Sequence, residues 1–251
     1  MKEYIDTIPV NEGFESGDEC PFCFMERAAE QSAIRYVVGP GASYMEPDVR
    51  AATDKAGFCV HHMKMLYDYG NTLGNALIMQ TYFVSMFEEM VAEMEKFQRP
   101  GKRGLFSKKP TEENGLVTWM RNKQGSCYIC NKLAYNMERY YATFYQLIKE
   151  GEFRTKVENS KGFCMRHFLA LMEKAPTELP NGQIDWFYDT VFTLMRSNLA
   201  RVKGDLDWFV EKFDYRNASA DWKNSRDAVS RTMQKLQGIY PADPPYKSEP
   251  R

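Results

Sequence analysis

The chain has 251 residues, with 33 basic and 34 acidic side chains and a formal net charge of −1 at pH 7. This balance gives no overall field that would favour nucleic acid or a membrane surface, so we expect neither as a partner. Hydrophobic residues make up 43% and aromatic residues 14% of the chain. The composition is therefore that of a globular protein, long enough for one large domain or two smaller ones.

The sequence also bears on where the protein works. No stretch reaches the roughly 18 uninterrupted apolar residues that a membrane-spanning helix needs. The first residues, Met-Lys-Glu-Tyr-Ile-Asp, lack the basic and then apolar layout of a secretory signal. We therefore expect a cytoplasmic protein, in which thiols stay reduced and paired cysteines bind metal more often than they form structural disulfides.

The first half of the chain predicts three helices. Residues 1–19 are acidic and are expected to lie on the surface as an arm. Apolar residues at helical spacing then predict helices over residues 23–38, 59–69 and 72–98. Between the first two of these, residues 44–50 are expected to form part of a loop.

The second half repeats this order. Helices are predicted over residues 133–149, 162–174 and 184–213. A polar segment and a last helix, ending near residue 236, have no counterpart in the first half. Because no segment alternates apolar and polar residues with a period of two, we expect an all-α protein.

These elements suggest two tandem, related helical units, the second with an added C-terminal helix. The expected divisions are a first unit over residues 1–98, a basic linker over 99–115, a second unit over 116–238 and a disordered Pro-rich tail over 239–251. Residues 1–98 carry 16 acidic and 7 basic side chains, a net −9, which leaves 18 acidic and 26 basic, a net +8, for the rest. The halves are expected to attract each other; a polyanion-binding face on the second half is the alternative.

All six cysteines belong to one pattern that occurs twice. A CxxC motif is followed by Gly-Phe-Cys-x-x-His, so that each copy offers three sulfurs and one imidazole. This is the ligand set of a closed tetrahedral metal site. The predicted ligands are Cys20, Cys23, Cys59 and His62 for one site, and Cys127, Cys130, Cys164 and His167 for the other.

The spacing explains how these ligands meet. A CxxC turn lets both sulfurs face one ion at about 2.3 Å, and in GFCxxH the cysteine and histidine are neighbours on one helical face. The loop of roughly 35 residues between the motifs closes at modest entropic cost, because that cost grows only logarithmically. Each half is therefore expected to build its own site from its own two motifs.

Residues beside the ligands have expected roles as well. Gly57 and Gly162 are expected to adopt a backbone conformation closed to other residues, and Phe58 and Phe163 to cover the sites. His61 matches an arginine in the second copy, so His62 is the predicted ligand. His61 is then a surface histidine beside the site, or a group that does not bind the metal but contacts a residue that does.

Three chemistries fit this ligand set. One zinc ion per site, two in all, is favoured because zinc suits Cys3His and needs no open position. Two iron–sulfur clusters are the alternative, since histidine can replace cysteine at iron. Reversible dithiol–disulfide chemistry is the third, but no βαβ pattern surrounds either CxxC and GFCxxH would have no role in it.

The polar segment before the last helix is a second candidate site. The favoured interpretation is a polar turn between two helices, in which Ser225 or Asp221 caps the last helix and Arg216 pairs with an acidic residue of the first half. The alternative is a site for an anionic or sugar-like ligand, with Arg216 as the charge partner and Trp222 as a stacking face. The candidate residues are Asp214, Tyr215, Arg216, Asn217, Trp222 and Asn224.

Several motifs together resemble an uncharacterised bacterial family, a domain of unknown function with duplicated CxxC…GFCxxH motifs. The resemblance runs from about residue 20 to 238 and includes Glu-Pro-Asp-Val-Arg, Asn-x-Leu-Gly, Met-Glu-Arg-Tyr and Trp-Phe-x-x-Lys-Phe-Asp-Tyr-Arg-Asn. It implies the duplicated metal site and supplies no activity.

The function expected from the sequence is a metal-binding helical scaffold that binds a protein partner or a small ligand. The alternative is a redox or catalytic protein with [4Fe–4S] clusters. No Ser-His-Asp set, Gly-rich phosphate loop or HExxH motif is visible, so whether the protein is an enzyme stays open.

Overall fold

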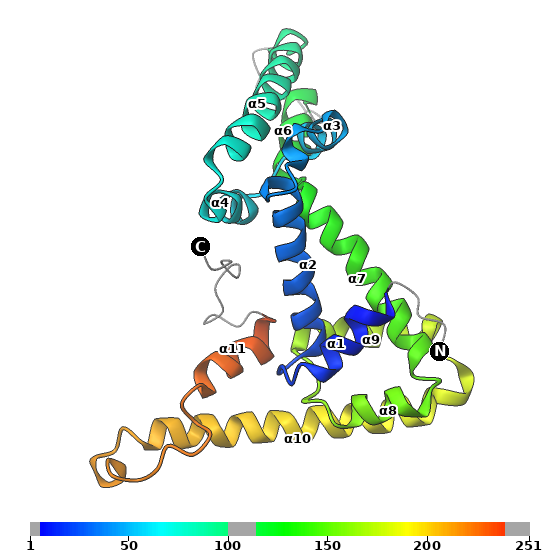
Figure 1. The fold of residues 1–251 in the computed structure, drawn as a ribbon, viewed down its shortest axis with the longest axis vertical. Helices are drawn as coiled ribbons and strands as arrows, with labels where there is room; N and C mark the ends of the chain where they lie inside the picture. Colours follow the sequence, from blue (N-terminus) through cyan, green and yellow to red (C-terminus); the bar gives the residue numbers. More distant parts are fainter. Residues whose placement is uncertain (1–5, 100–113, 239–251) are drawn as a thin grey trace, which may run out of the picture. The chain divides into compact units, whose positions relative to one another are not determined.

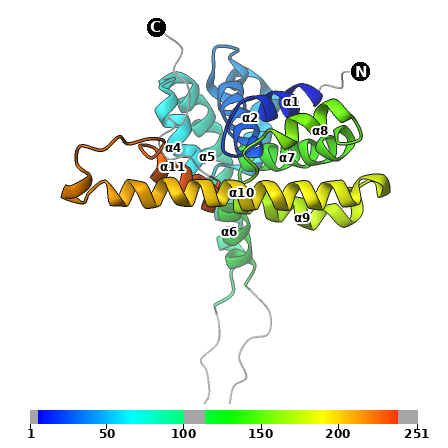
Figure 2. The same ribbon diagram turned by 90° about the horizontal axis from the view of Figure 1, so that it is seen from below.

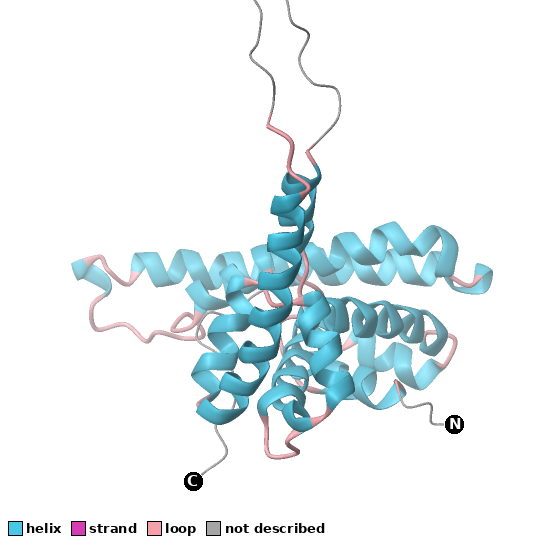
Figure 3. Cartoon of the chain, turned by 90° about the horizontal axis from the view of Figure 1, so that it is seen from above, coloured by secondary structure: helices cyan, strands magenta, loops and turns pink. Residues whose placement is uncertain are grey.

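The computed structural model describes residues 6–99 and 114–238, and within them the fold is all-α, as predicted (Figure 1). Eleven α-helices and three short 3₁₀ turns make up these ranges, with no strand among them (Figure 3). Residues 100–113 of the predicted linker and the whole predicted tail, 239–251, lie outside the described residues.

The described residues form two compact units, and the divisions fall inside the helices α2 (Pro21–Val38) and α7 (Tyr128–Leu147). Each unit therefore takes segments from both halves of the sequence, which differs from the expected division into an N-terminal and a C-terminal unit. The first unit contains residues 6–29 and 135–238, and the second contains residues 30–99 and 114–134.

The first unit has an aromatic core. The rings of Phe14, Phe22, Phe144 and Phe163 pack so that every pair of ring centroids lies 5.7–6.4 Å apart. Figure 2 shows the long helix α10 along its length. Helix α11 contacts both α10 and α9. Besides parts of α2 and α7, the helices are α1 (Thr7–Glu15), α8 (Gly151–Glu158), α9 (Met165–Glu178), α10 (Ile184–Glu211) and α11 (Ala228–Gln237).

The second unit is arranged around α5, which contacts α3, α4 and α6. Its core is mainly aliphatic, with Ile34, Val37, Leu66, Ile78 and Ile129 almost fully buried. Besides parts of α2 and α7, its helices are α3 (Pro47–Ala56), α4 (Val60–Tyr69), α5 (Thr72–Glu95) and α6 (Gly115–Gly125).

The N-terminal segment, expected to be a surface arm, is instead the helix α1 of the first unit. Val10 is fully buried and Phe14 is 7% exposed. The two residues are four apart, so they share one face of the helix. Asp6, just before α1, forms an ion pair with Arg139 of α7 at 2.6 Å. The helix was not predicted, because its apolar face has only two large side chains and the segment around them is acidic.

Three short helices, α3, α6 and α8, were not predicted. Helix α3 occupies the segment expected to be a loop, with Pro47 in its first turn, where proline is well tolerated. It buries only Val49 and Thr53, and α8 buries only Phe153 and Val157. Two buried residues do not define a helical hydrophobic periodicity, so a helix this short cannot be distinguished from a loop in the sequence.

The helices keep the same order in the two halves of the sequence. A helix that starts at CxxC, a short helix, a GFCxxH helix and a long helix follow one another as α2 to α5, and again as α7 to α10. That the two halves are structurally related repeats stays a prediction.

Candidate metal centres

All eight predicted ligands gather in two clusters, and each cluster lies within one unit. In each cluster the four ligand atoms lie within 4.8 Å of one another. The cluster of the first unit, here the buried cluster, contains Cys20, Cys23, Cys164 and His167. The cluster of the second unit, here the open cluster, contains Cys59, His62, Cys127 and Cys130.

The pairing of the motifs is crossed, so the expectation that each half builds its own site is wrong. The CxxC of each half meets the GFCxxH of the other half. Helices α2 and α7 begin at the CxxC motifs and contain 18 and 20 residues, which rise about 27 and 30 Å. They carry the chain away from CxxC before the GFCxxH of the same half begins. A backbone hydrogen bond from Tyr128 to Gly57, 2.9 Å long, fastens the second CxxC beside the first GFCxxH.

The buried cluster is compact and sealed. Nδ1 of His167 lies 3.4, 3.4 and 3.2 Å from the sulfurs of Cys20, Cys23 and Cys164. The sulfurs of Cys23 and Cys164 are 3.6 Å apart. None of the four side chains is more than 2% exposed, so a bound ion would be closed off from solvent.

Aromatic and charged groups surround this cluster. The rings of Phe22 and Tyr141 lie 5.8 and 6.4 Å from the imidazole of His167. On the other side of that imidazole, the carboxylate of Glu26 lies 3.6 Å from Nε2 and also pairs with Arg166. A carboxylate near the distal nitrogen favours the orientation in which Nδ1 faces the sulfurs.

The open cluster repeats this geometry with more exposure. Nδ1 of His62 lies 3.2, 3.3 and 3.4 Å from the sulfurs of Cys59, Cys127 and Cys130. The sulfurs of Cys59 and Cys130 are 3.9 Å apart. His62 and Cys127 are buried, whereas Cys59 is half-buried and Cys130 is exposed. One edge of this cluster therefore faces solvent.

Glu30 contacts the nitrogen of His62 that does not face the sulfurs of the open cluster. Its Oε1 lies 3.0 Å from Nε2 of His62 and 3.1 Å from Nε2 of His61. Burial alone would raise the pKa of Glu30, but the hydrogen bonds with the two histidines lower it. His61 is outside the Cys3His group and shares the carboxylate that orients His62, so it supports the ligand indirectly.

The two glutamates were missed by the sequence interpretation. Glu26 lies three residues after Cys23 on α2, a spacing that puts both on one helical face and that was a usable signal. Glu30 contacts His62, 32 residues along the chain, and no local spacing pointed to it.

Hydrogen bonds within the clusters shift the pKa values of several predicted ligands. Burial alone would lower the pKa of His62, but its hydrogen bonds with Cys127 and Glu30 raise it to about 10. Burial also opposes the shift at Cys127, whose pKa falls to about 6 because of hydrogen bonds with His62 and with backbone groups. In the buried cluster, hydrogen bonds from Cys20 and Cys23 lower the pKa of Cys164. Thiolate character at the sulfurs is what a bound cation requires.

The residues before each GFCxxH cysteine behave as predicted. Gly57 has φ 63° and Gly162 has φ 72°, in the left-handed region that favours glycine. A Cβ on Gly57 would also collide with the hydroxyl of Tyr82. Phe58 and Phe163 are 6% and 0% exposed, and each joins the core next to its cluster.

Several polar groups in the segment after α10 pair with other groups of the same segment. Arg216 pairs with Asp214 at 2.6 Å, so the predicted pairing with an acidic residue of the first half is wrong. The ammonium of Lys212 donates to the carbonyl oxygen of Asn217 at 2.6 Å and to two more carbonyls nearby. The side chain of Tyr215 is 86% exposed.

Trp222 and Asn224 have contacts of their own in this segment. The indole of Trp222 packs 5.8 Å from the ring of Phe209, and Asn224 lines a polar pocket described below. Neither Ser225 nor Asp221 caps the last helix, because the N-cap of α11 is Asp227. A ligand held by the six predicted residues together stays a prediction.

Comparisons with known proteins place the chain in a family but give no activity. A family model described as a family of unknown function matches residues 1–243. The chain belongs to this family, DUF6062. This confirms the resemblance to an uncharacterised domain family. Neither a curated protein nor a solved structure matches the chain. Among the described helices, none is both long and apolar enough to cross a membrane.

The crossed pairing makes a prediction for combined variants of this DUF6062 member. Cys20→Ser with Cys164→Ser should lose one metal ion per chain, because both changes fall in the buried cluster. Cys20→Ser with Cys59→Ser should lose two, because it damages both clusters. Metal content of the purified variants, measured by inductively coupled plasma mass spectrometry, decides between the arrangements. Pairing within each half would give the reverse result.

Proposed function

We propose that the protein is a metal-binding helical scaffold that holds one zinc ion in each of its two Cys3His clusters and binds a small ligand or a protein partner. The observation that carries the proposal is the convergence of eight ligand atoms into two groups of four, each within 4.8 Å. Three sulfurs and one imidazole complete a tetrahedral coordination shell and leave no open position.

The spacing of the ligand atoms supports a single ion in each cluster. With zinc–sulfur bonds of about 2.3 Å, a tetrahedral site separates two sulfurs by about 3.8 Å. One sulfur–sulfur pair in each cluster comes close to this value, Cys23 and Cys164 at 3.6 Å in the buried cluster and Cys59 and Cys130 at 3.9 Å in the open cluster. In a four-iron cluster each ligand binds a different iron atom, so the ligand atoms would have to stand further apart.

The buried cluster supports a structural role for its ion. It joins the start of α2 to the start of α9, which are 141 residues apart at Cys23 and Cys164. Four ligands without solvent access leave no position for a substrate. An ion there would tie distant segments of the aromatic core together, as structural zinc does in small domains.

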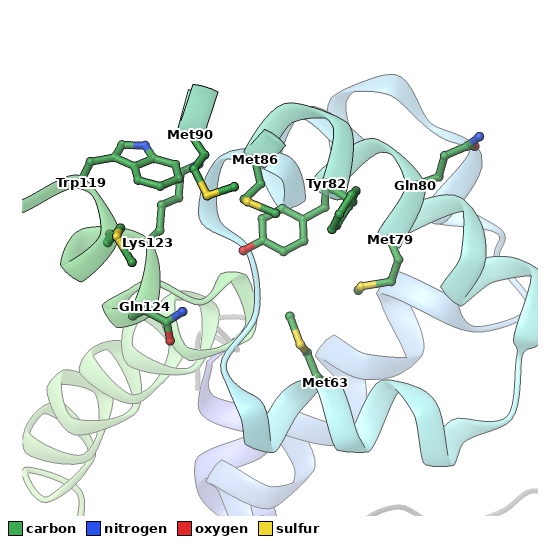
Figure 4. A pocket seen from close by; sticks show the side chains of 11 residues that line it. Met63, Met79, Gln80, Tyr82, Met86, Met90, Trp119, Lys123 and Gln124 are labelled. Atoms are coloured by element: carbon green, nitrogen blue, oxygen red, sulfur yellow. The ribbon is translucent and has the colours of Figure 1, made fainter. Parts of the chain in front are cut away.

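The second unit also offers a place for an apolar ligand. A cavity of about 740 Å³ opens between α4, α5 and α6 (Figure 4), a size typical of small-molecule sites. Five methionines line it together with three aromatic side chains, and methionine adapts its shape to varied apolar groups. The lining methionines are Met63, Met79, Met86, Met90 and Met120.

Elemental analysis of protein purified without oxygen tests the metal assignment. We expect two zinc ions per chain, no inorganic sulfide and a colourless sample, because each cluster supplies four ligands to one ion. Brown protein that contains iron and sulfide would overturn the zinc assignment and support the iron–sulfur alternative. Absence of any bound metal after anaerobic purification would overturn both.

A further inference from the structure

Besides the apolar cavity of the second unit, the first unit contains a polar cavity of about 380 Å³. Helices α10 and α11 and the segment between them contribute to its wall, together with residues that immediately precede the two motifs of the buried cluster. Its volume is near the lower end of the range for small-molecule sites, which limits an occupant to a small molecule.

The wall of this cavity has a surplus of positive charge. Five cationic side chains line it, against three carboxylates, which leaves two positive charges in excess. The cations are Lys161, Arg201, Lys223, Arg226 and Arg231. A surplus of this kind favours an anion that carries about two negative charges.

The three carboxylates are already used inside the wall. Arg231, 9% exposed, pairs with Asp205 and Asp227 at 2.8 Å each. Glu19, 4% exposed, pairs with Arg201 at 2.5 Å and with the buried ammonium of Lys235 at 3.4 Å. These pairs fix the back of the cavity and neutralise two of its five cations.

Two of the remaining cations are positioned without a carboxylate. The ammonium of Lys223 lies 4.2 Å from the ring centre of Trp208, and the guanidinium of Arg226 lies 5.8 Å from that of Trp222. Both side chains are exposed, and within the described residues neither forms an ion pair. The aromatic rings hold these cations in place without using up their hydrogen-bond donors.

One acceptor of the wall also lacks a hydrogen bond. Oε1 of Glu19 is the single buried side-chain nitrogen or oxygen atom in the described part of the chain without a hydrogen-bond partner. The ammonium of Lys161 lies 3.8 Å from this oxygen. A ligand hydroxyl group would supply the missing donor, because burying an unpaired carboxylate oxygen is costly.

We propose that this cavity binds the phosphate monoester of a small hydroxylated molecule. A phosphate monoester carries about −1.5 to −2 charges at pH 7, which matches the surplus of two. Arg226, Lys223 and Lys161 bind the phosphate oxygens, with the planar guanidinium able to contact two of them at once. A hydroxyl of the ligand donates to Glu19. None of the residues that line the cavity is a predicted metal ligand, and the test does not depend on which metal the clusters bind.

Isothermal titration calorimetry of the full chain with glycerol 3-phosphate, at constant ionic strength, tests this site. We expect one ligand per chain, and a Kd that rises at least about tenfold in Arg226→Gln and in Lys223→Gln, because each change removes a charge-assisted contact. Arg216→Gln is the matched control, since it removes the same charge from an exposed side chain that pairs with Asp214 instead. Its Kd should change less than about twofold.

Two further ligands test the chemical class. Methyl phosphate lacks the hydroxyl groups and should bind about tenfold more weakly than glycerol 3-phosphate, because the bond to Glu19 is lost. Inorganic phosphate should also bind more weakly than the ester. The proposal is wrong if glycerol 3-phosphate does not bind, or if Arg216→Gln weakens binding as much as Arg226→Gln does. Equal affinity for all three phosphates would overturn the assignment to a hydroxylated ester.

Discussion

The variant Cys164→Ser should lose one metal ion per chain and melt at least about 10 °C lower than the wild type. Structural zinc contributes its binding free energy to folding. Loss of about 5 kcal/mol or more corresponds to this shift, since 1 kcal/mol moves the melting temperature of a protein this size by about 2–4 °C. Cys164 is fully buried among Phe22, Phe163 and the other ligands, so a serine there also leaves two thiolates without their counter-ion in the core.

Differential scanning calorimetry together with metal analysis measures this effect. Arg216→Ala is the control, because that side chain is exposed and lies outside both clusters. Its metal content should stay at two ions and its melting temperature within about 1–2 °C of the wild type. A Cys164→Ser protein that has lost an ion but melts at the wild-type temperature would contradict a structural role. A redox or catalytic role for the buried cluster would then be favoured.

A large difference in metal exchange between the two clusters is the second expected result. The open cluster should release its ion to an excess of chelator at least about tenfold faster than the buried cluster, because a competing ligand can reach exposed sulfur directly. Cys130 is exposed and Cys59 is half-buried, whereas Cys20, Cys23 and Cys164 have no more than 2% exposure. Absorbance of a metallochromic chelator should therefore rise in two phases of equal amplitude.

Variants assign the phases to the clusters. Cys127→Ser with Cys130→Ser removes the open cluster and should leave only the slow phase. Cys20→Ser with Cys23→Ser removes the buried cluster and should leave only the fast phase, provided that circular dichroism shows the protein to be folded. A single phase in the wild type, or a fast phase that survives in the first variant, would show that exposure does not control exchange.

The ligand pattern was readable from the sequence because it is local. CxxC and GFCxxH fix the separation of their own side chains within one turn of backbone, so all eight candidate ligands that the structure gathers into two clusters were named from the sequence. The long helices α5 and α10 were also predicted, since apolar positions recur along 24 and 28 residues. The positive φ angles of Gly57 and Gly162 followed from the same local reasoning.

Where the signal was short or the contact distant, the sequence interpretation failed. Helix α1 buries Val10 and Phe14 in the first unit, and two apolar residues in an acidic stretch looked like a surface arm. At the polar segment, the predicted partner of Arg216 was wrong. Arg216 pairs with Asp214, two residues away, and not with an acidic residue of the first half.

Local patterns in the sequence were enough to predict the eight candidate ligands, their division into two groups of four and a helical fold. Three further features came from the folded structure. It shows which CxxC meets which GFCxxH, that one cluster is sealed while the other reaches solvent, and that Glu26 and Glu30 lie next to Nε2 of the two histidines. The physical reason is that both copies offer chemically identical ligands, so local spacing gives no energy difference between paired and crossed arrangements. The paths of α2 and α7, and the cores around them, supply that difference.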